Sequence, residues 1–166
     1  MAVLPVLRLP NPVLKTVAQP VGTVDDHARR LAVDLLDTMR ASPACVGLAA
    51  NQVGATERAF CVDVSGHKKA VSCHGAFVLF DPKLLVARDP ESAREGCMSV
   101  PDLTGNVARA TSIVVQGLTP EGTERVIEAD AFEARAILHE LDHLDGFVFL
   151  DRVSSVGDVF PRVKYR

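Results

Sequence analysis

The segment His139-Glu140-Leu141-Asp142-His143 constrains this 166-residue chain more than any other feature of its sequence. Histidines four residues apart lie on one face of an α-helix, where both imidazoles can bind a single cation. Glu140 is rotated around the helix axis, in the place that a general base needs to take a proton from water at the metal's open position. The pattern is specific when it lies on a helix. It therefore predicts a helix that carries two metal ligands and a base.

The residues around this segment have helical spacing. Phe132, Ala136, His139 and His143 share one face, which predicts a helix from Asp130 to Leu144. An earlier helix is predicted to open at Thr23, because Thr23 and Asp26 have capping-box spacing, and to end before Pro43. Its apolar residues recur on one face: Val24, Ala28, Leu31, Leu35 and Met39.

Short runs rich in Val, Phe and Ile predict strands at 58–64, 76–80, 112–118 and 123–128. Turn-forming residues at 117–122 predict that the last two strands form a hairpin. Four prolines in the first twenty residues predict an extended arm. We expect an α+β fold, with antiparallel sheets packed around a central helix that carries the HExxH motif and with a preceding N-terminal helix. No repeat or linker divides residues 1–166, so we expect a single catalytic domain.

The composition limits the partners of the chain. Hydrophobic residues make up 48% and charged residues 23%, a globular balance, and a net charge of -3 disfavours binding to nucleic acid. No stretch approaches the roughly 20 apolar residues that span a bilayer, and the N-terminus lacks the pattern of a secretory signal. Four cysteines with irregular spacing do not suggest a disulfide framework. We therefore expect a cytoplasmic protein without a membrane partner.

A catalytic metal needs a third protein ligand. A distal glutamate is excluded because no Glu follows Glu140, and Phe149 stands where the metzincin pattern has its third histidine. The remaining candidates lie upstream: Cys45, Cys61, Cys73, Cys97, His27, His67 and His74.

Cys97 stands out among these candidates because Gly96 permits a turn or bulge that could aim the thiolate inward. A small buried hydrophobe is an equally good interpretation of the local sequence. Cys61 alternates with apolar neighbours and is predicted to lie in the core. We expect His67, Lys68, Lys69 and His74 to be solvated, with a weak adventitious metal site as the alternative. We expect Glu95 and Arg109 to form a buried pair.

Three segments together resemble the peptide deformylases, which remove the formyl group from the N-terminal formylmethionine of nascent proteins. They are Cys45-Val-Gly-Leu-Ala-Ala-Asn-Gln52, Glu95-Gly-Cys-Met-Ser99 and the HExxH segment. The resemblance implies that Cys97, His139 and His143 bind the metal and that Glu140 is the acid and base. It also implies that the Gln52 side chain and the Met98 backbone N–H stabilise the oxyanion. Residues Val46, Gly47 and Gly96 are expected to contact the substrate.

The resemblance implies Fe²⁺ as the native metal, with Zn²⁺, Ni²⁺ or Co²⁺ in purified samples, because one thiolate and two imidazoles suit several of these ions. It implies a formylmethionyl peptide as partner and proximity to the ribosome. The chain departs from the family at two positions. Cys45 replaces the usual Gly. Thr104 replaces a common Arg and so removes a positive charge near the expected path of the peptide. Two alternatives therefore stay open: a hydrolase of a different or shorter N-acyl substrate, and a metal-binding protein without turnover.

Overall fold

The computed structural model describes residues 2–163. The helices are α1 (Asp26–Ala41) and α2 (Ala131–Leu144), with short 3-10 helices at η1 (Pro12–Lys15), η2 (Ala50–Val53), η3 (Phe149–Asp151) and η4 (Val156–Asp158). The strands are β1 (Gly47–Ala49), β2 (Ala59–Val62), β3 (Phe77–Cys97), β4 (Val100–Leu118), β5 (Glu124–Asp130) and β6 (Val159–Pro161).

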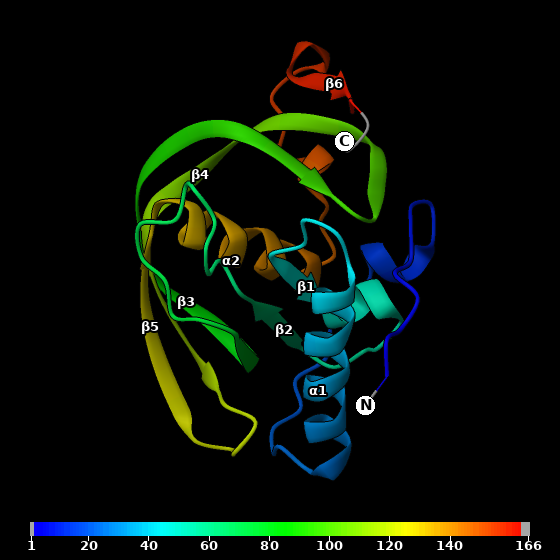
Figure 1. Ribbon diagram of the computed structural model, residues 1–166, viewed down its shortest axis with the longest axis vertical. Coiled ribbons are helices and arrows are strands. Elements are labelled where there is room, and N and C mark those ends of the chain that lie inside the picture. Colours follow the sequence, from blue (N-terminus) through cyan, green and yellow to red (C-terminus); the bar gives the residue numbers. More distant parts are fainter. Residues whose placement is uncertain (1, 164–166) are drawn as a thin grey trace.

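The strands form one antiparallel sheet in the order β1-β2-β3-β4-β5, and β6 pairs with β4. Figure 1 shows β3, β4 and β5 curling around α2, while α1 lies outside the curl beside β1 and β2. This arrangement confirms the predicted α+β fold with a central motif-bearing helix. The strands make one continuous curled sheet, which places α2 in its hollow.

The long hairpin of β3 and β4 goes far beyond the predicted strands at 76–80 and 112–118. Most of residues 83–96 are exposed and several are charged, so the alternation that identifies a half-buried strand is missing. Pairing with β4 holds this polar segment in the sheet. The register shifts between Gly96 and Cys97, which confirms the irregularity expected at Gly96.

The predicted start of the first helix is wrong by a few residues. Helix α1 begins at Asp26, and the side chain of Asp25 caps it by accepting a hydrogen bond from the N–H of Ala28 at 2.8 Å. Asp25 is therefore the capping residue, and Thr23 lies outside the helix. The second helix agrees with its prediction, since α2 follows Asp130 directly and ends at Leu144.

Two apolar clusters hold the helices in place. One lies inside the curl and joins Ile137, Leu141 and Leu144 of α2 to the sheet. The other joins α1 to β1, β2 and β3, and it contains Cys61, whose fully buried side chain confirms its predicted core position. Burying such side chains contributes roughly 1.5 to 3 kcal/mol each. Within residues 2–163, neither helix has the length and apolar character needed to cross a bilayer.

The N-terminal arm lies across the segments that follow β1 and β3. The N–H of Leu7 donates to the carbonyl of Gln52 at 2.7 Å, and the N–H of Leu9 donates to that of Ser99 at 3.0 Å. The arm is extended as predicted, apart from one 3-10 turn at Pro12–Lys15. The arm therefore joins the segment that ends at Gln52 to the segment that ends at Ser99 through backbone hydrogen bonds.

Candidate metal centre and substrate cleft

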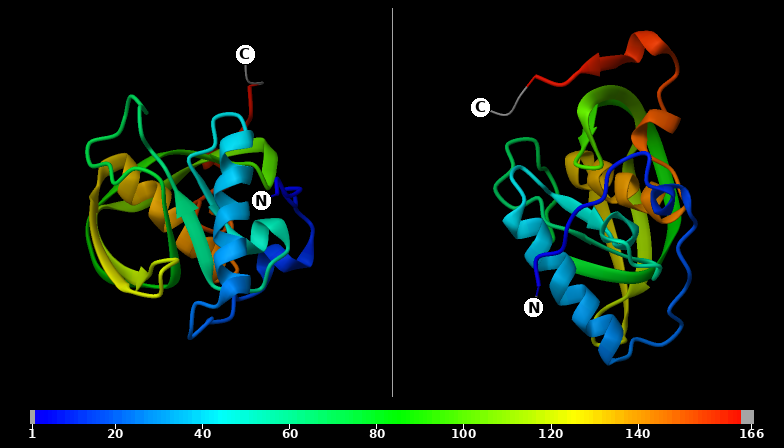
Figure 2. Two further views of the ribbon diagram at one scale, coloured as in Figure 1. Left: turned by 60° about the horizontal axis from the view of Figure 1, so that its bottom comes forward. Right: turned by 90° about the vertical axis from the view of Figure 1, so that its right-hand side faces the viewer.

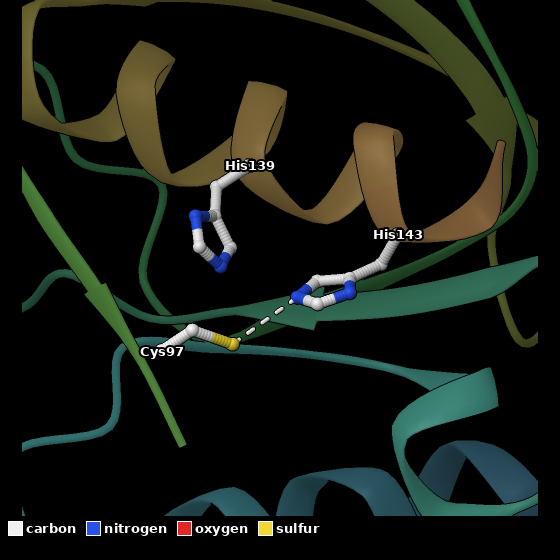
Figure 3. Close-up of side chains that lie close together, drawn as sticks. All are labelled: Cys97, His139 and His143. Carbon is white, nitrogen blue, oxygen red and sulfur yellow. Dashed lines mark hydrogen bonds between the residues drawn. The ribbon is translucent and has the colours of Figure 1, made fainter. Parts of the chain in front are cut away.

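Helix α2 and the end of β3 bring three metal-binding side chains together. Cys97, His139 and His143 each offer a ligand atom, and these atoms lie within 4.8 Å of one another. Figure 3 shows both rings descending from α2 toward the sulfur, with Sγ of Cys97 3.3 Å from Nε2 of His143. One thiolate and two imidazoles form a donor set that suits Zn²⁺ or Fe²⁺ and leaves room for a further ligand.

The electrostatics of the cluster favour the ligating form of Cys97. Burial alone would raise the pKa of this thiol, but the charge on His143 and hydrogen bonds with His139 and His143 outweigh burial and hold the pKa well below its ordinary value. The thiolate is the form that binds a metal.

Glu140 is buried beside these three residues. Its Oε2 atom has no hydrogen-bond partner within the described part of the chain, residues 2–163. Burial raises the pKa of Glu140 to about 7, against the opposing charges of His139 and His143. Buried polar atoms normally have a hydrogen-bond partner. A bound metal that carries a further polar ligand would provide one for this oxygen. A pKa near neutrality is also what proton transfer at physiological pH requires.

Glu95 fixes the orientation of the cluster from the opposite side of His139. Its carboxylate accepts two hydrogen bonds from Arg109, at 2.9 and 3.0 Å, and one from Arg135 at 2.7 Å. This geometry confirms the predicted buried pair of Glu95 and Arg109. Arg109 also pairs with Asp142 of α2, so the network links β3, β4 and the motif helix.

Gln52 extends from η2 to the other side of the sulfur. Its Oε1 accepts from the N–H of Ala49 at 2.9 Å, which turns Nε2 toward Sγ of Cys97 at 3.5 Å and Oγ of Ser99 at 3.0 Å. Met98 follows Cys97 in the tight connection to β4. The two predicted oxyanion donors are the Gln52 side chain and the Met98 backbone N–H. Both therefore belong to segments next to Sγ of Cys97.

Eight of the nine predicted site residues line one cleft of about 280 Å³. His143 is fully buried behind the cleft. Gly47 is required on the wall facing Glu140, because a Cβ there would lie 2.8 Å from the Glu140 Oε1. Phe132 and Ala136 of α2 give one side of the cleft an apolar surface.

Sequence reasoning missed several residues that support the site. Asn51 anchors η2 by donating its side-chain N–H to the carbonyl of His143, and Ser99 accepts from Gln52. Both residues lie inside the segments that resemble peptide deformylases, so that resemblance could have identified them. Arg162 also lines the cleft, although it is remote from every motif.

The expectation of solvated histidines is only partly right, because His67 and His74 are half-buried. The ring of His67 stacks on Phe132 with centroids 3.9 Å apart, and Nδ1 of His74 lies 2.6 Å from Oε1 of the fully buried Glu133. Both partners belong to the first turn of α2, which is distant in sequence from the loop. Lys68 and Lys69 are exposed as predicted.

Comparison with known proteins agrees with this geometry. The family model described as polypeptide deformylase matches residues 3–158. The chain belongs to the peptide deformylase family. Its cluster of Cys97, His139 and His143 is thus the candidate metal site of a metal-dependent hydrolase family.

Individual deformylases are similar over nearly the whole chain. The peptide deformylase of Desulforudis audaxviator is 40% identical over 157 residues, which cover 94% of this chain and 97% of the relative. That of Rhizobium meliloti is 38% identical over 159 residues, which cover 94% and 88%. The structure of Ehrlichia chaffeensis peptide deformylase in complex with actinonin has a TM-score of 0.87 and 33% identity, and the match covers 95% of this chain and 92% of that one.

Proposed function

We propose that residues 1–166 act as a single catalytic domain that hydrolyses the formyl group from the N-terminal formylmethionine of nascent peptides. The observation that carries this proposal is the position of Glu140, a buried carboxylate beside the cluster of Cys97, His139 and His143, with one oxygen that has no hydrogen-bond partner among residues 2–163. A binding protein has no need of a base at this point. Membership of the peptide deformylase family supports the same reaction.

A divalent cation held by Cys97, His139 and His143 would supply Lewis acidity to the formyl carbonyl and to the attacking water. Glu140 takes the proton of that water and later delivers it to the nitrogen of the leaving amine. The Nε2 group of Gln52 and the backbone N–H of Met98 donate to the oxygen that becomes negative. Losing one such donor costs about 3 kcal/mol of transition-state stabilisation.

The cleft walls suggest how the peptide is held. Gly47 and Gly96 both line the cleft, and Val46 flanks Gly47. An extended peptide between them would form backbone hydrogen bonds of the kind that strands form. The methionine side chain then lies against the apolar surface of Phe132 and Ala136. In relatives of this family, solved structures include one with Met-Ala-Ser bound, from Acinetobacter baumannii.

We infer Fe²⁺ as the native metal and the cytoplasm, near the ribosome, as the place of action. Four free cysteines suit a reducing compartment, and a thiolate beside two imidazoles suits Fe²⁺ as well as Zn²⁺, Ni²⁺ or Co²⁺. Metal analysis of protein purified without oxygen distinguishes these ions.

Formate release tests the proposed reaction. Protein loaded with Fe²⁺ under anaerobic conditions, or with Ni²⁺ or Co²⁺, is expected to release formate from a formyl-Met tripeptide amide. Glu140→Ala should keep its metal and lose turnover, which separates an enzyme from a metal-binding protein. Formyl-Met and an acetyl-Met tripeptide test the alternative of a shorter or different acyl substrate. Absence of formate from every formyl substrate with the metal site filled would refute the proposal.

A further inference from the structure

The loop between β2 and β3 lies against the first turn of α2. The ring of His67 stacks on that of Phe132, with ring centroids 3.9 Å apart and ring planes 4° from parallel. The left view of Figure 2 shows this loop, in green, beside the start of α2. Phe132 lines the cleft that contains the metal cluster, and it is one of the two residues proposed to contact the methionine side chain of the substrate. His67 therefore supports one wall of the cleft.

Hydrogen bonds with the backbone hold His67 at this position. Its N–H donates to the carbonyl of Val64 at 3.0 Å, and its carbonyl accepts from the N–H of Ala70, also at 3.0 Å. The Nδ1 atom of its ring accepts from the N–H of Lys69 at 3.1 Å. An accepting Nδ1 carries no proton, so the imidazole is neutral. Burial and the charge of Lys69 also lower the pKa of His67. The ring thus packs on its partner as a neutral aromatic surface in a fixed orientation.

The same loop is fastened to the next residue of α2. The fully buried carboxylate of Glu133 accepts from the hydroxyl of Ser72 at 2.8 Å and from the N–H of His74 at 2.7 Å. Nδ1 of His74 lies 2.6 Å from the same carboxylate. Phe132 and Glu133 are adjacent, so the loop is attached to one turn of α2 at two points. The position of the His67 ring is therefore tied to the helix that carries the metal ligands.

His67 also lines a second cavity, of about 400 Å³, that adjoins the cleft. Residues 44–46 line both the cleft and this second cavity. His67 lies between the two spaces, because it lines one of them and contacts a wall residue of the other. Removal of the imidazole would uncover one face of the Phe132 ring and leave room beside it. The imidazole thus occupies space that a longer substrate side chain would need.

We propose that His67 is a specificity-determining residue, which holds Phe132 in place and so limits the length of the side chain that the formylated residue can carry. A side chain as long as that of methionine fits against the supported ring, whereas a longer unbranched chain needs the room that the imidazole fills. His67 is a positioning residue, since it acts through Phe132. This inference rests on the proposed deformylase function.

Substrates of increasing side-chain length test this limit. The series is formyl-X-Ala-Ser-amide, in which X is methionine, norleucine or 2-aminooctanoic acid. For the wild type, we expect kcat/KM with 2-aminooctanoic acid to be at least about tenfold below that with methionine, because a filled pocket rejects extra methylene groups. In His67→Ala, kcat/KM for the methionine peptide should fall about three- to tenfold, mainly through KM, and the ratio of the two substrates should approach one.

Further variants at position 67 separate the stacked ring from other effects. His67→Phe keeps an aromatic ring against Phe132 and should retain the wild-type ratio. His67→Asn keeps an acceptor for the N–H of Lys69 but lacks the ring, so it should shift the ratio as His67→Ala does. It also supplies the readout if the alanine variant unfolds. Lys68→Ala is the matched control, because Lys68 is exposed in the same loop, and it should resemble the wild type with every substrate.

Metal content and Tm of each variant show that the site is filled and the protein folded. A wild type that hydrolyses the 2-aminooctanoic acid peptide as well as the methionine peptide would overturn the inference. An equal loss with all three substrates in His67→Ala and His67→Asn would also overturn it, since a purely structural role has that effect. An unchanged ratio in both variants would do the same while leaving deformylation intact. Failure of the wild type with every formyl peptide would instead refute the proposed function.

Discussion

The Nδ1 atom of His139 lies 2.9 Å from Oε1 of Glu95. This contact fixes the ring of a candidate metal ligand and leaves its Nε2 facing the cleft, where Cys97 lies. Glu95 is itself held by Arg109 and Arg135, so the orientation of His139 depends on a carboxylate that two cations immobilise. Groups that orient ligating histidines in this way raise metal affinity.

Glu95→Gln is expected to weaken metal binding about 10- to 100-fold, because the amide is a poorer partner for the His139 ring. The free energy of unfolding should also fall, by about 3 to 5 kcal/mol, because the buried Arg109 loses a countercharge. Competition with a chelating dye, below the unfolding temperature, measures the affinity.

Glu128→Gln serves as the control for this change, because Glu128 is exposed on β5 and lies outside the cluster. Its metal affinity should equal that of the wild type. An unchanged affinity in Glu95→Gln would show that the His139 ring needs no fixed partner.

Gly47→Ala should lower kcat by about 100-fold while the metal stays bound. The new methyl group would lie 2.8 Å from Oε1 and 3.2 Å from Cδ of Glu140, so the acid and base must shift, and small displacements of catalytic groups are costly. Steady-state formate release and metal analysis of the same sample give the two readouts.

Gly157→Ala is a matched glycine control, since among the described residues a Cβ there meets only Oγ of Ser155, at 3.5 Å. It should retain full activity. If Gly47→Ala were equally active, contact between position 47 and Glu140 would have no catalytic importance.

The Cys45 thiol should resist alkylation although it lines the cleft. Burial, together with the charge of Glu140, raises the pKa of this thiol to about 12. At pH 8 only about one molecule in ten thousand would carry the reactive thiolate. We expect iodoacetamide to modify the exposed Cys73 first and Cys45 much more slowly, as peptide mass mapping over time would show.

Raising the pH toward 10 should accelerate the labelling of Cys45 about tenfold per pH unit, because the thiolate fraction rises by that factor below the pKa. Equal labelling rates for Cys45 and Cys73 at pH 8 would contradict the prediction.

Asp151 should make stability depend on acid pH through its contact with the N-terminal arm. Burial alone would raise its pKa, but hydrogen bonds from Lys15 and from the N–H of Val148 lower the pKa below the ordinary 3.8. A lowered folded-state pKa stabilises the fold above 3.8, and this contribution disappears as the pH falls through the folded-state value. Asp151→Asn should therefore lower Tm at pH 7, and its gap from wild type should narrow below pH 3.8.

Adding Lys15→Ala to Asp151→Asn should cause little further loss, since the pair is already broken. The difference in Tm between Asp151→Asn and the wild type should shrink in high salt, because the side chains of Lys15 and Asp151 are both partly exposed. A gap in Tm that stays constant from pH 7 to pH 3 would contradict the assignment.

Much of the fold was predictable where the hydrophobic pattern of a segment matches its burial in the structure. The apolar spacing of residues 130–144 identified α2, and the turn residues near Gly122 identified the hairpin of β4 and β5. The second half of β3, residues 83–96, was missed. Its residues are polar and exposed, so the strand is defined by pairing with β4 and has no pattern of its own.

The sequence by itself determined the chemistry of the centre. The spacing of His139, Glu140 and His143 requires a helix to bring two ligands and a base together, and the family-like segments singled out Cys97 and Gln52. Helical geometry is local, so residues four apart converge whatever surrounds them.

Tertiary structure alone decided which further residues support the centre and which residues line the mouth of its cleft. Thr104 indicated a lost positive charge, yet strand β6 brings Arg162 to Gly96, 66 positions earlier in the chain. Arg135 and Asp142 likewise extend the predicted pair of Glu95 and Arg109 into a network that joins two strands to α2. Such contacts depend on register and on the curl of the sheet, and these arise from packing between segments that are distant in sequence.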